Sequence, residues 1–447
     1  MSRRRGAYLV FVLASLSGVR PVAADEDSTP PDVPYVFVAE PGFGMESGVL
    51  SVSSLSRVVG LYDAQLSQAL RFEENGAARA GLGIAGRLTK TLLVDLPLVD
   101  METVFIHEVF GHGARGREAG KSPTYVFRLP GPYGKWLDGD KENPHEAYTY
   151  QAETGRPERD LPMALGGIEA DYFTAYWGNL RLMQRDGFMH YRDMMEYGMS
   201  KLNYFGRLRA DLSTYPEDTI QAGDPDNYIT ELQERFNRWR PEGRAAIARS
   251  LRRAYVFNFI DPTFWLCAYH GLVTYLIRGE RAAEMPRLKL GDVFLFPGTR
   301  FNLTPFGAEH YVDLFAGTKD MVGDVYGRAG SSGLATYWGL GGRVMGFEPG
   351  GGVTLGGELD LWYQPEILFH ERYVFDRPNL VGVNAGVHLG WRIIGPVGVV
   401  GKVAYKTKGY VMGQPVAQGF HGYAGISLAT DLEPGFIDRL QSPVQGG

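Results

Sequence analysis

Two histidines enclose a glutamate in the hexapeptide HEVFGH at residues 107–112. Neutral imidazoles bind Zn²⁺ at about 2.0–2.1 Å, and a catalytic zinc keeps three protein ligands and leaves one position for water. The metal lowers the pKa of that water to about 7, and a neighbouring glutamate can then take its proton. His107 and His112 are therefore candidate metal ligands, and Glu108 is the candidate general base of a hydrolase.

The spacing of the two histidines predicts a distorted helix. They lie five positions apart, which in a regular helix separates their side chains by roughly 140°, whereas the common zincin motif places its histidines four apart on one face. One extra residue absorbed as a π-bulge brings positions five apart back into line, and Gly111 makes such a bulge possible. We therefore predict a π-bulge in the helix that carries the motif.

The same residues resemble the signature of a known family. His-Glu-x-x-Gly-His, usually continued by glycine, is typical of the dipeptidyl-peptidase III metallopeptidases, and residues 107–113 are similar to it. The resemblance is local to this motif. It implies that His107 and His112 bind zinc, that Glu108 is the general base and that the substrate is a peptide or protein.

A third ligand is required, and the resemblance implies a glutamate on a downstream helix, in a motif where Glu-x-x-Ala is followed by an acid. Residues 166–171 match only in part, because the family's ligand position falls on Gly167. We expect Glu169 to be the third ligand. Two alternatives stay open: Asp171, which can bind metal or orient a ligating histidine, and Glu118, which lies on nearly the same helix face as His107.

Three further side chains are candidates for stabilising charge in the transition state: His270, Tyr148 and Arg115. The simpler interpretation of His270 is a core histidine, and that of Tyr148 is a residue of a solvated loop. The apolar stretch at residues 254–277 is interrupted by Asp261 and a proline, which leaves too few residues for a membrane span. We predict a buried helix there.

The N-terminus predicts export. Three arginines precede an apolar run, and small residues end at Ala24, which is the layout of a secretory signal peptide at residues 1–24. Its removal takes away four arginines and no acids, so the formal net charge moves from −6 to −10. An acidic chain without basic clusters argues against nucleic-acid binding. The single cysteine, Cys267, excludes intramolecular disulfides and cysteine-based zinc sites.

Hydrophobic periodicity divides the rest of the chain. Residues 25–59 read as a leader with short strands, and residues 60–285 have helical composition. From 286 to 433 apolar residues alternate with polar or small ones, as in an antiparallel sheet, and residues 434–447 form a polar tail. The sequence thus predicts an α+β fold: a mainly helical, metallohydrolase-like domain followed by an antiparallel, β-barrel-like domain. Alternation does not distinguish an outer-membrane barrel from a soluble barrel or sandwich.

These features together predict an exported, zinc-dependent hydrolase of the cell envelope, in the periplasm or at the outer membrane. Its activity is expected to be that of a metallopeptidase. The alternative is a noncatalytic outer-membrane β-barrel protein with a structural or vestigial metal site, and a third is a soluble periplasmic binding module. A structural zinc needs four closed ligands, so a fourth protein ligand would favour the noncatalytic alternative.

Overall fold

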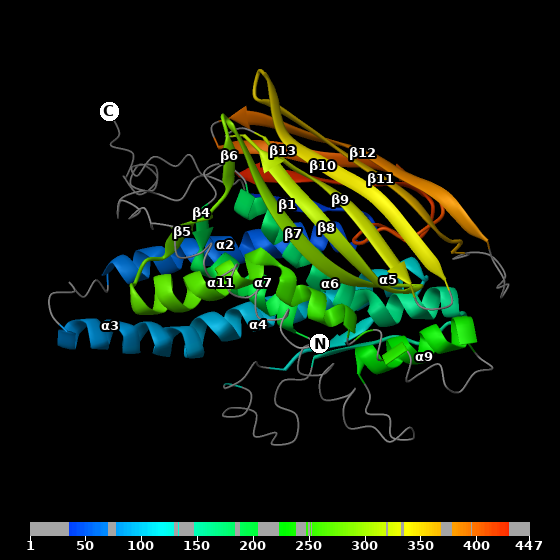
Figure 1. Ribbon diagram of the computed structural model, residues 1–447, viewed down its shortest axis with the longest axis horizontal. Coiled ribbons are helices and arrows are strands. Elements are labelled where there is room, and N and C mark those ends of the chain that lie inside the picture. Colours follow the sequence, from blue (N-terminus) through cyan, green and yellow to red (C-terminus); the bar gives the residue numbers. More distant parts are fainter. Residues whose placement is uncertain are drawn as a thin grey trace, which may run out of the picture.

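The computed structural model describes residues 35–69, 77–128, 133, 147–183, 188–203, 223–237, 247–248, 251, 253–318, 321–331, 335–367, 378–394 and 396–428. The predicted signal peptide at 1–24 and the predicted tail at 434–447 lie outside these residues. Figure 1 shows a layer of helices beneath a strongly tilted sheet.

The helices are α2 (Met45–Ala69), α3 (Ala77–Lys90), η1 (Thr91–Asp95), α4 (Leu96–Phe105), η2 (Ile106–His112), α5 (Gly113–Glu118), α6 (Pro157–Met183), α7 (Tyr191–Leu202), α9 (Asp224–Asn237), η4 (Val256–Ile260), α11 (Pro262–Tyr269) and η5 (His270–Ile277). The segments from α3 to α5 follow one another without a break, and η1 and η2 are π-helical stretches within that run. Helix α6 is the centre of the core. It packs against η2, α7, α9 and the strands of the sheet.

The strands are β1 (Tyr35–Ala39), β2 (Thr124–Val126), β3 (Tyr148–Tyr150), β4 (Phe188–His190), β5 (Ala282–Glu284), β6 (Leu288–Leu290), β7 (Val293–Thr304), β8 (Gly307–Gly317), β9 (Val322–Ser331), β10 (Thr336–Gly350), β11 (Val353–Pro365), β12 (Asn379–Ile394), β13 (Val397–Lys406) and β14 (Gly419–Leu428). The large sheet has ten strands in the order β1-β14-β13-β12-β11-β10-β9-β8-β7-β6. All its pairings are antiparallel. The predicted mixture of helices and an antiparallel sheet is confirmed.

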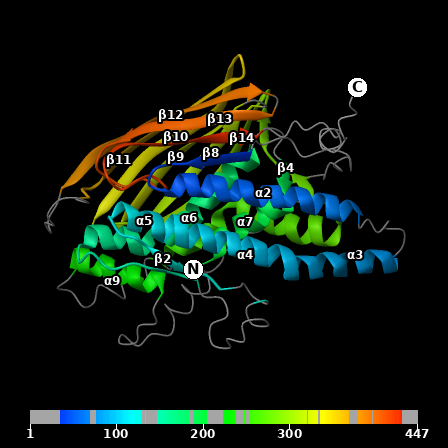
Figure 2. The same ribbon diagram turned by 180° about the vertical axis from the view of Figure 1, so that it is seen from behind.

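The predicted barrel is wrong in one respect, because the sheet does not close: β1 and β6 are its two ends and do not pair with each other. The concave side is occupied by helices, chiefly α6, so there is no room for the sheet to curl onto itself. The predicted leader is also part of the fold, since β1 pairs with β14 and α2 begins at Met45. Figure 2 shows α2 running along this end of the sheet.

No helix among the described residues is both long enough and apolar enough to cross a membrane.

Candidate metal centre

The motif lies on a π-helical turn, as its spacing predicts. Residues Ile106–His112 form η2, and this wider turn brings the rings of His107 and His112 to a centroid distance of 4.8 Å. Both histidines are buried. A regular helix would have directed the two rings apart. The prediction of a π-bulge is therefore confirmed, and the two imidazoles converge.

The carboxylate that meets both rings belongs to Asp224, the first residue of α9. Its Oδ2 lies 3.1 Å from Nε2 of His107, and its Oδ1 lies 3.2 Å from Nε2 of His112. One ligand atom from each of the three residues lies within 4.8 Å of the others. Two imidazole nitrogens and one carboxylate are a ligand set typical of catalytic zinc, which keeps a further position for water.

The outer nitrogens of both rings have partners that fix their orientation. Nδ1 of His107 lies 3.1 Å from Oδ2 of Asp171, and Nδ1 of His112 lies 2.7 Å from the carbonyl oxygen of Met163. Metal-binding histidines commonly donate their second N–H to a carboxylate or carbonyl in this way. Of the two roles considered for Asp171, its contact with His107 fits the orienting one.

The number of protons that the two imidazole rings can carry favours a cation between them. A neutral imidazole donates from one nitrogen only, and Nδ1 of His112 must donate to the Met163 carbonyl. Its Nε2 lone pair would then face the Asp224 carboxylate. A second proton on each ring removes that conflict but places two imidazolium ions side by side, which repel each other. A divalent cation among the three side chains removes both difficulties, so these residues fit a metal ion.

The carboxylates of the site favour positive charge among these residues, which protons on the rings or a metal ion can supply. Burial disfavours the charged form of His107, yet Asp171 and Asp224 outweigh it and raise the pKa of His107 well above its usual value. Asp224 raises the pKa of His112 against the same cost of burial. Burial likewise opposes ionisation of Asp224, but the two histidines hold its pKa well below its usual range. The site is therefore built around an ionised carboxylate.

Glu108 is held in place beside this group. The hydroxyl of Thr149 on β3 donates to Oε2 of Glu108 over 2.6 Å and lies 3.0 Å from its main-chain oxygen. The charge of Glu108 acts on His112. A general base has to be fixed next to the metal ligands without being a ligand itself, and Glu108 meets this requirement. Tyr148, the candidate stabiliser, precedes Thr149 on β3 and stacks edge-to-face on Tyr150.

Three glycines let η2 and α6 cross in backbone contact. A Cβ on Gly111 would lie 2.6 Å from the carbonyl oxygen of Gly166, and one on Gly166 would lie 2.7 Å from that of Gly111. At Gly167 a Cβ would lie 2.2 Å from Nε2 of His107 and 2.6 Å from Nε2 of His112. The space beside Gly167, the position where the motif's resemblance implied a glutamate ligand, is thus filled here by the imidazoles.

We expect Gly167→Ala to lower zinc affinity, because the added methyl group overlaps both ligating nitrogens. The loss should be about 10–100-fold, as when the supporting shell of a metal site is disturbed. Competition titration against a fluorescent zinc chelator measures it. Gly178→Ala on the same helix is the matched control, since its nearest neighbour would lie at 3.4 Å. Equal affinity in both variants would contradict this account of the crossing.

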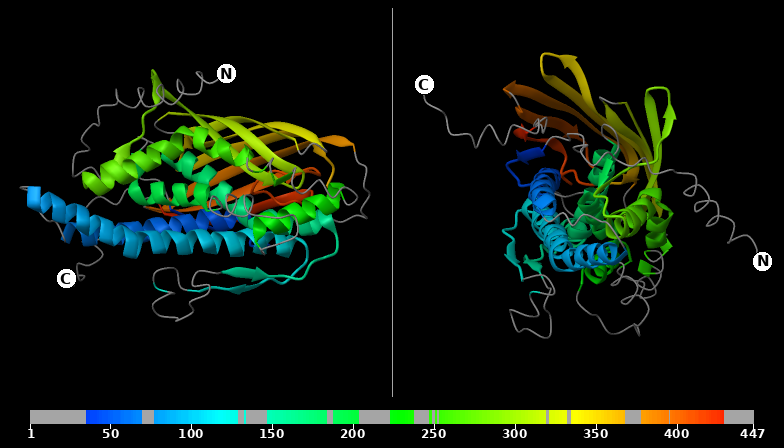
Figure 3. Two further views of the ribbon diagram at one scale, coloured as in Figure 1. Left: turned by 60° about the horizontal axis from the view of Figure 1, so that its bottom comes forward. Right: turned by 90° about the vertical axis from the view of Figure 1, so that its left-hand side faces the viewer.

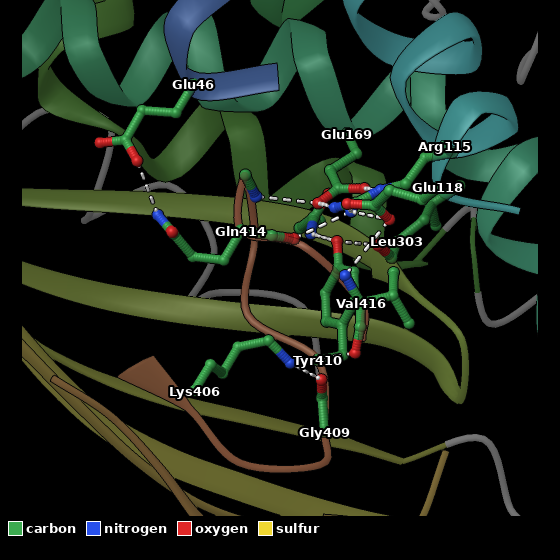
Figure 4. A network of polar contacts seen from close by, with 12 residues as sticks. Glu46, Arg115, Glu118, Glu169, Leu303, Lys406, Gly409, Tyr410, Gln414 and Val416 are labelled. Carbon is green, nitrogen blue, oxygen red and sulfur yellow. Dashed lines mark hydrogen bonds and ion pairs between the residues drawn. The ribbon is translucent and has the colours of Figure 1, made fainter. Parts of the chain in front are cut away.

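The predicted third ligand, Glu169, is placed elsewhere. It is fully buried in an ion pair with Arg115 and accepts a hydrogen bond of 2.8 Å from the main-chain N–H of Gly413. Figure 4 shows that Glu169 points to Arg115 and to the loop before β14. Glu169 lies two positions after Gly167, about 200° further around the helix, so its side chain leaves α6 in a different direction from that of position 167. Among the described residues Asp224, and not Glu169, joins the histidines.

Arg115 and Glu118 also serve this structural contact. Arg115 is 1% exposed, forms ion pairs with Glu169 and Glu118, and donates to the carbonyl oxygen of Gln414. Burial opposes the charge of Arg115, but Glu169 and Glu118 raise its pKa above its already high usual value. Glu118 in turn accepts from the main-chain N–H of Val416. The structure thus places both side chains in this contact, whereas the described metal group consists of His107, His112 and Asp224.

His270 is also placed away from the metal group. It lies in η5, which packs on α3, α7 and α11, and its Nδ1 is 2.9 Å from the hydroxyl of Thr274 one turn later. The structure does not bring it to the histidines of η2, so the simpler interpretation, a core histidine, fits better.

Asp224 was missed because its local sequence has another explanation. An aspartate followed by proline and a second aspartate is typical of a helix start, and α9 does begin there. Nothing in that pattern indicates a contact with residues more than a hundred positions earlier. The signal that the sequence offers is an acidic residue at a helix start, which capping already explains.

Comparisons with known proteins add no relative. No family model, no curated protein and no solved structure matches the chain.

Proposed function

We propose that the protein is an exported, zinc-dependent hydrolase that cleaves peptide bonds. The observation that carries the proposal is the convergence of His107, His112 and Asp224, with Glu108 held alongside by Thr149. Bound there, zinc would acidify a water molecule and polarise the scissile carbonyl. Three protein ligands are the number that a catalytic zinc takes, with water in the further position, and the described group has three, which favours a catalytic over a structural site.

The chain's own residues then have definite tasks. Glu108 takes a proton from the attacking water and passes it to the leaving amine. Thr149 donates to the Oε2 atom of Glu108 and keeps the carboxylate from rotating away. Asp171 and the Met163 carbonyl fix the two imidazole rings by accepting from their Nδ1 atoms. The choice of a peptide substrate rests on the motif's resemblance to dipeptidyl-peptidase III enzymes, and the export on residues 1–24.

Chelation tests this proposal. The purified protein should contain one zinc per chain, hydrolyse a fluorogenic peptide library, and lose both metal and activity on dialysis against a chelator. Re-addition of zinc should restore activity, because the ligands and the base remain in place. Metal content is read by atomic emission and hydrolysis by fluorescence. Protein that holds no metal after growth and purification with added zinc would overturn the proposal.

A further inference from the structure

The large sheet has its polarity reversed relative to a sheet that packs in water. Its concave, helix-covered face carries charged side chains, which are rarely buried unless they are paired. Here they are buried and paired: Arg300 with Asp313, Arg328 with Glu309, Arg343 with Glu358, and Lys402 with Glu46 of α2. The concave face thus combines buried ion pairs with apolar side chains such as Phe301 and Phe315, which belong to the core.

The convex face is the opposite. Its exposed side chains are almost all apolar and include Val312, Leu314, Val325, Trp338, Leu340, Phe347, Leu359, Leu361, Tyr363, Val381, Val387, Leu389, Trp391, Val403, Tyr405, Phe420 and Ile426. Strands β8, β9, β11, β13 and β14 expose no charged residue, and β10 and β12 expose only Glu348 and Arg392, near their ends. A continuous apolar surface of this extent on a protein marks an interaction site.

The helical side carries a matching stripe. Between Gly81 and Phe105 every exposed residue is uncharged, and the large ones are Leu82, Leu88, Leu92, Val94, Leu98, Met101 and Phe105. The charged residue Lys90 instead pairs inward with buried Asp95, which also binds Arg192. This stretch is about 36 Å long at the rise of a helix, against about 30 Å for the hydrocarbon core of a bilayer.

A second stripe runs along η4, α11 and η5. The exposed residues from Val256 to Ile277 are all apolar or aromatic: Val256, Ile260, Trp265, Tyr269, Leu272 and Ile277. Exposed Arg253 and Arg278 stand just beyond the two ends of the stripe. The predicted buried helix at 254–277 is therefore wrong in its burial, because one of its apolar faces is exposed.

The three surfaces surround the molecule. Figure 3 shows, in the view along the long axis, the sheet arching over one side and the helices α2, α3 and α4 with α11 completing the other. We call the convex face and the two helical stripes together the apolar girdle. A second copy of the chain or another protein would cover one side of such a girdle and leave the rest in water. A lipid bilayer covers all sides at once.

The open ends of the sheet are also closed in the way that lipid requires, since unpaired backbone groups do not face hydrocarbon. At the β1 end, the serines of α2 take the place of a further strand: the N–H groups of Val36 and Val38 donate to the hydroxyls of Ser54 and Ser51 over 2.9 Å. The hydroxyl of Ser51 returns a hydrogen bond of 2.8 Å to the carbonyl oxygen of Val38.

At the other end, helix side chains bind the free edge of β7. The ammonium group of Lys201 on α7 donates to the carbonyl oxygen of Thr299 over 2.9 Å, and the hydroxyl of Tyr228 on α9 donates to that of Thr304 over 2.7 Å. The wall that strands alone do not complete is thus completed by helices. Strands of 10 to 16 residues in β8–β14 are long enough to cross the hydrocarbon core at a tilt.

We propose that the apolar girdle is seated in a lipid bilayer, with the ten-stranded sheet and the helices α2, α3–α4 and η4–η5 together forming one closed, lipid-facing wall around an interior filled by α6. The inference does not depend on the metal chemistry. It deepens the proposed function by placing the catalytic residues at the membrane, because His107 lies two positions after Phe105, the last exposed apolar residue of its stripe.

Lipid contact can be read from single fluorescent labels. Cysteines replace Leu340 or Val387 on the sheet, or Leu272 on the η5 stripe, in a Cys267→Ala background, and each is labelled with an environment-sensitive dye. The protein is reconstituted into vesicles of phosphatidylethanolamine and phosphatidylglycerol, with or without lipid brominated on its acyl chains. All three labels should be quenched several-fold by brominated lipid, whereas a label at Glu348→Cys, the exposed charge at the end of β10, should be quenched little.

Two results would overturn the bilayer. One is that the protein stays monomeric in buffer without detergent and does not float together with the vesicles in a density gradient. The other is a dimer in which the labels at 340 and 387 are shielded but the label at 272 stays open to an aqueous quencher, since this identifies a second copy as the occupant. Zinc content is measured in the same preparations. Failure of lipid contact with zinc retained would therefore be distinguished from failure of the proposed enzyme.

Discussion

Glu108→Gln should bind zinc like the wild type and lose peptide hydrolysis by about 10²–10⁴-fold, the range that a positioned general base contributes. The amide has nearly the same shape as the carboxylate and can still accept the hydrogen bond from Thr149. It does not accept a proton from water. Metal content by atomic emission and steady-state rates on the best peptide of the library are the two measurements.

Thr149→Val is the matched variant for this experiment, because it leaves the carboxylate of Glu108 and removes only its tether. Its rate should lie between those of the wild type and Glu108→Gln. Equal turnover by Glu108→Gln and the wild type, at equal zinc content, would refute the assignment of Glu108 as the base. The proposed metal site would be unaffected by that result.

Asp224→Ala should weaken zinc binding by more than about 100-fold, since loss of an outer partner of a ligand alone costs about 10–100-fold. Among the residues that the structure describes, the substitution removes the carboxylate that meets both imidazoles, and the two Nε2 atoms lose the anion that they share. Zinc affinity is measured by competition with a chelator of known strength, and folding by near-ultraviolet circular dichroism.

Asp226→Ala is the control, because it removes a second acid from the same first turn of α9 and so has a similar effect on the helix start. It should keep zinc within a few-fold of the wild type. If the two alanine variants bind zinc equally well, Asp224 is not a ligand.

Glu169→Gln separates the structural from the ligating carboxylate. It leaves Arg115 with only Glu118 as an acidic partner, and breaking a buried ion pair costs about 3–5 kcal/mol. The variant should therefore unfold at lower denaturant concentration while its folded fraction keeps zinc. Loss of zinc from a variant that melts like the wild type would return Glu169 to the ligand set.

The contrast between Glu169 and Asp224 shows how far a local pattern reaches. The helical backbone of α6 sets the direction in which each of its side chains points. The contact of Gly111, Gly166 and Gly167 fixes how closely that helix approaches η2. With glycine at position 167, where the motif's resemblance implied a glutamate, the carboxylate has to come from another element. Only the packing of α9 against α6 shows which one.

Local sequence determined the features whose cause is local. Five-residue spacing around a glycine predicts the π-helical turn, and the turn brings His107 and His112 together. Alternation of apolar and polar residues predicts the strands and their antiparallel pairing, because the side chains of a strand point to opposite faces with a period of two. The proposal of Glu108 as the base comes from the same short motif.

Tertiary structure alone decided which carboxylate joins the histidines, that the sheet stays open, and which face of each element is covered. Periodicity reveals that a strand or helix has an apolar face but not whether protein or another medium contacts it. The buried pairs of Arg300, Arg343 and Lys402, and the serine contacts of β1, join residues far apart in the chain. Such contacts depend on the arrangement of whole elements in space, which no short segment specifies.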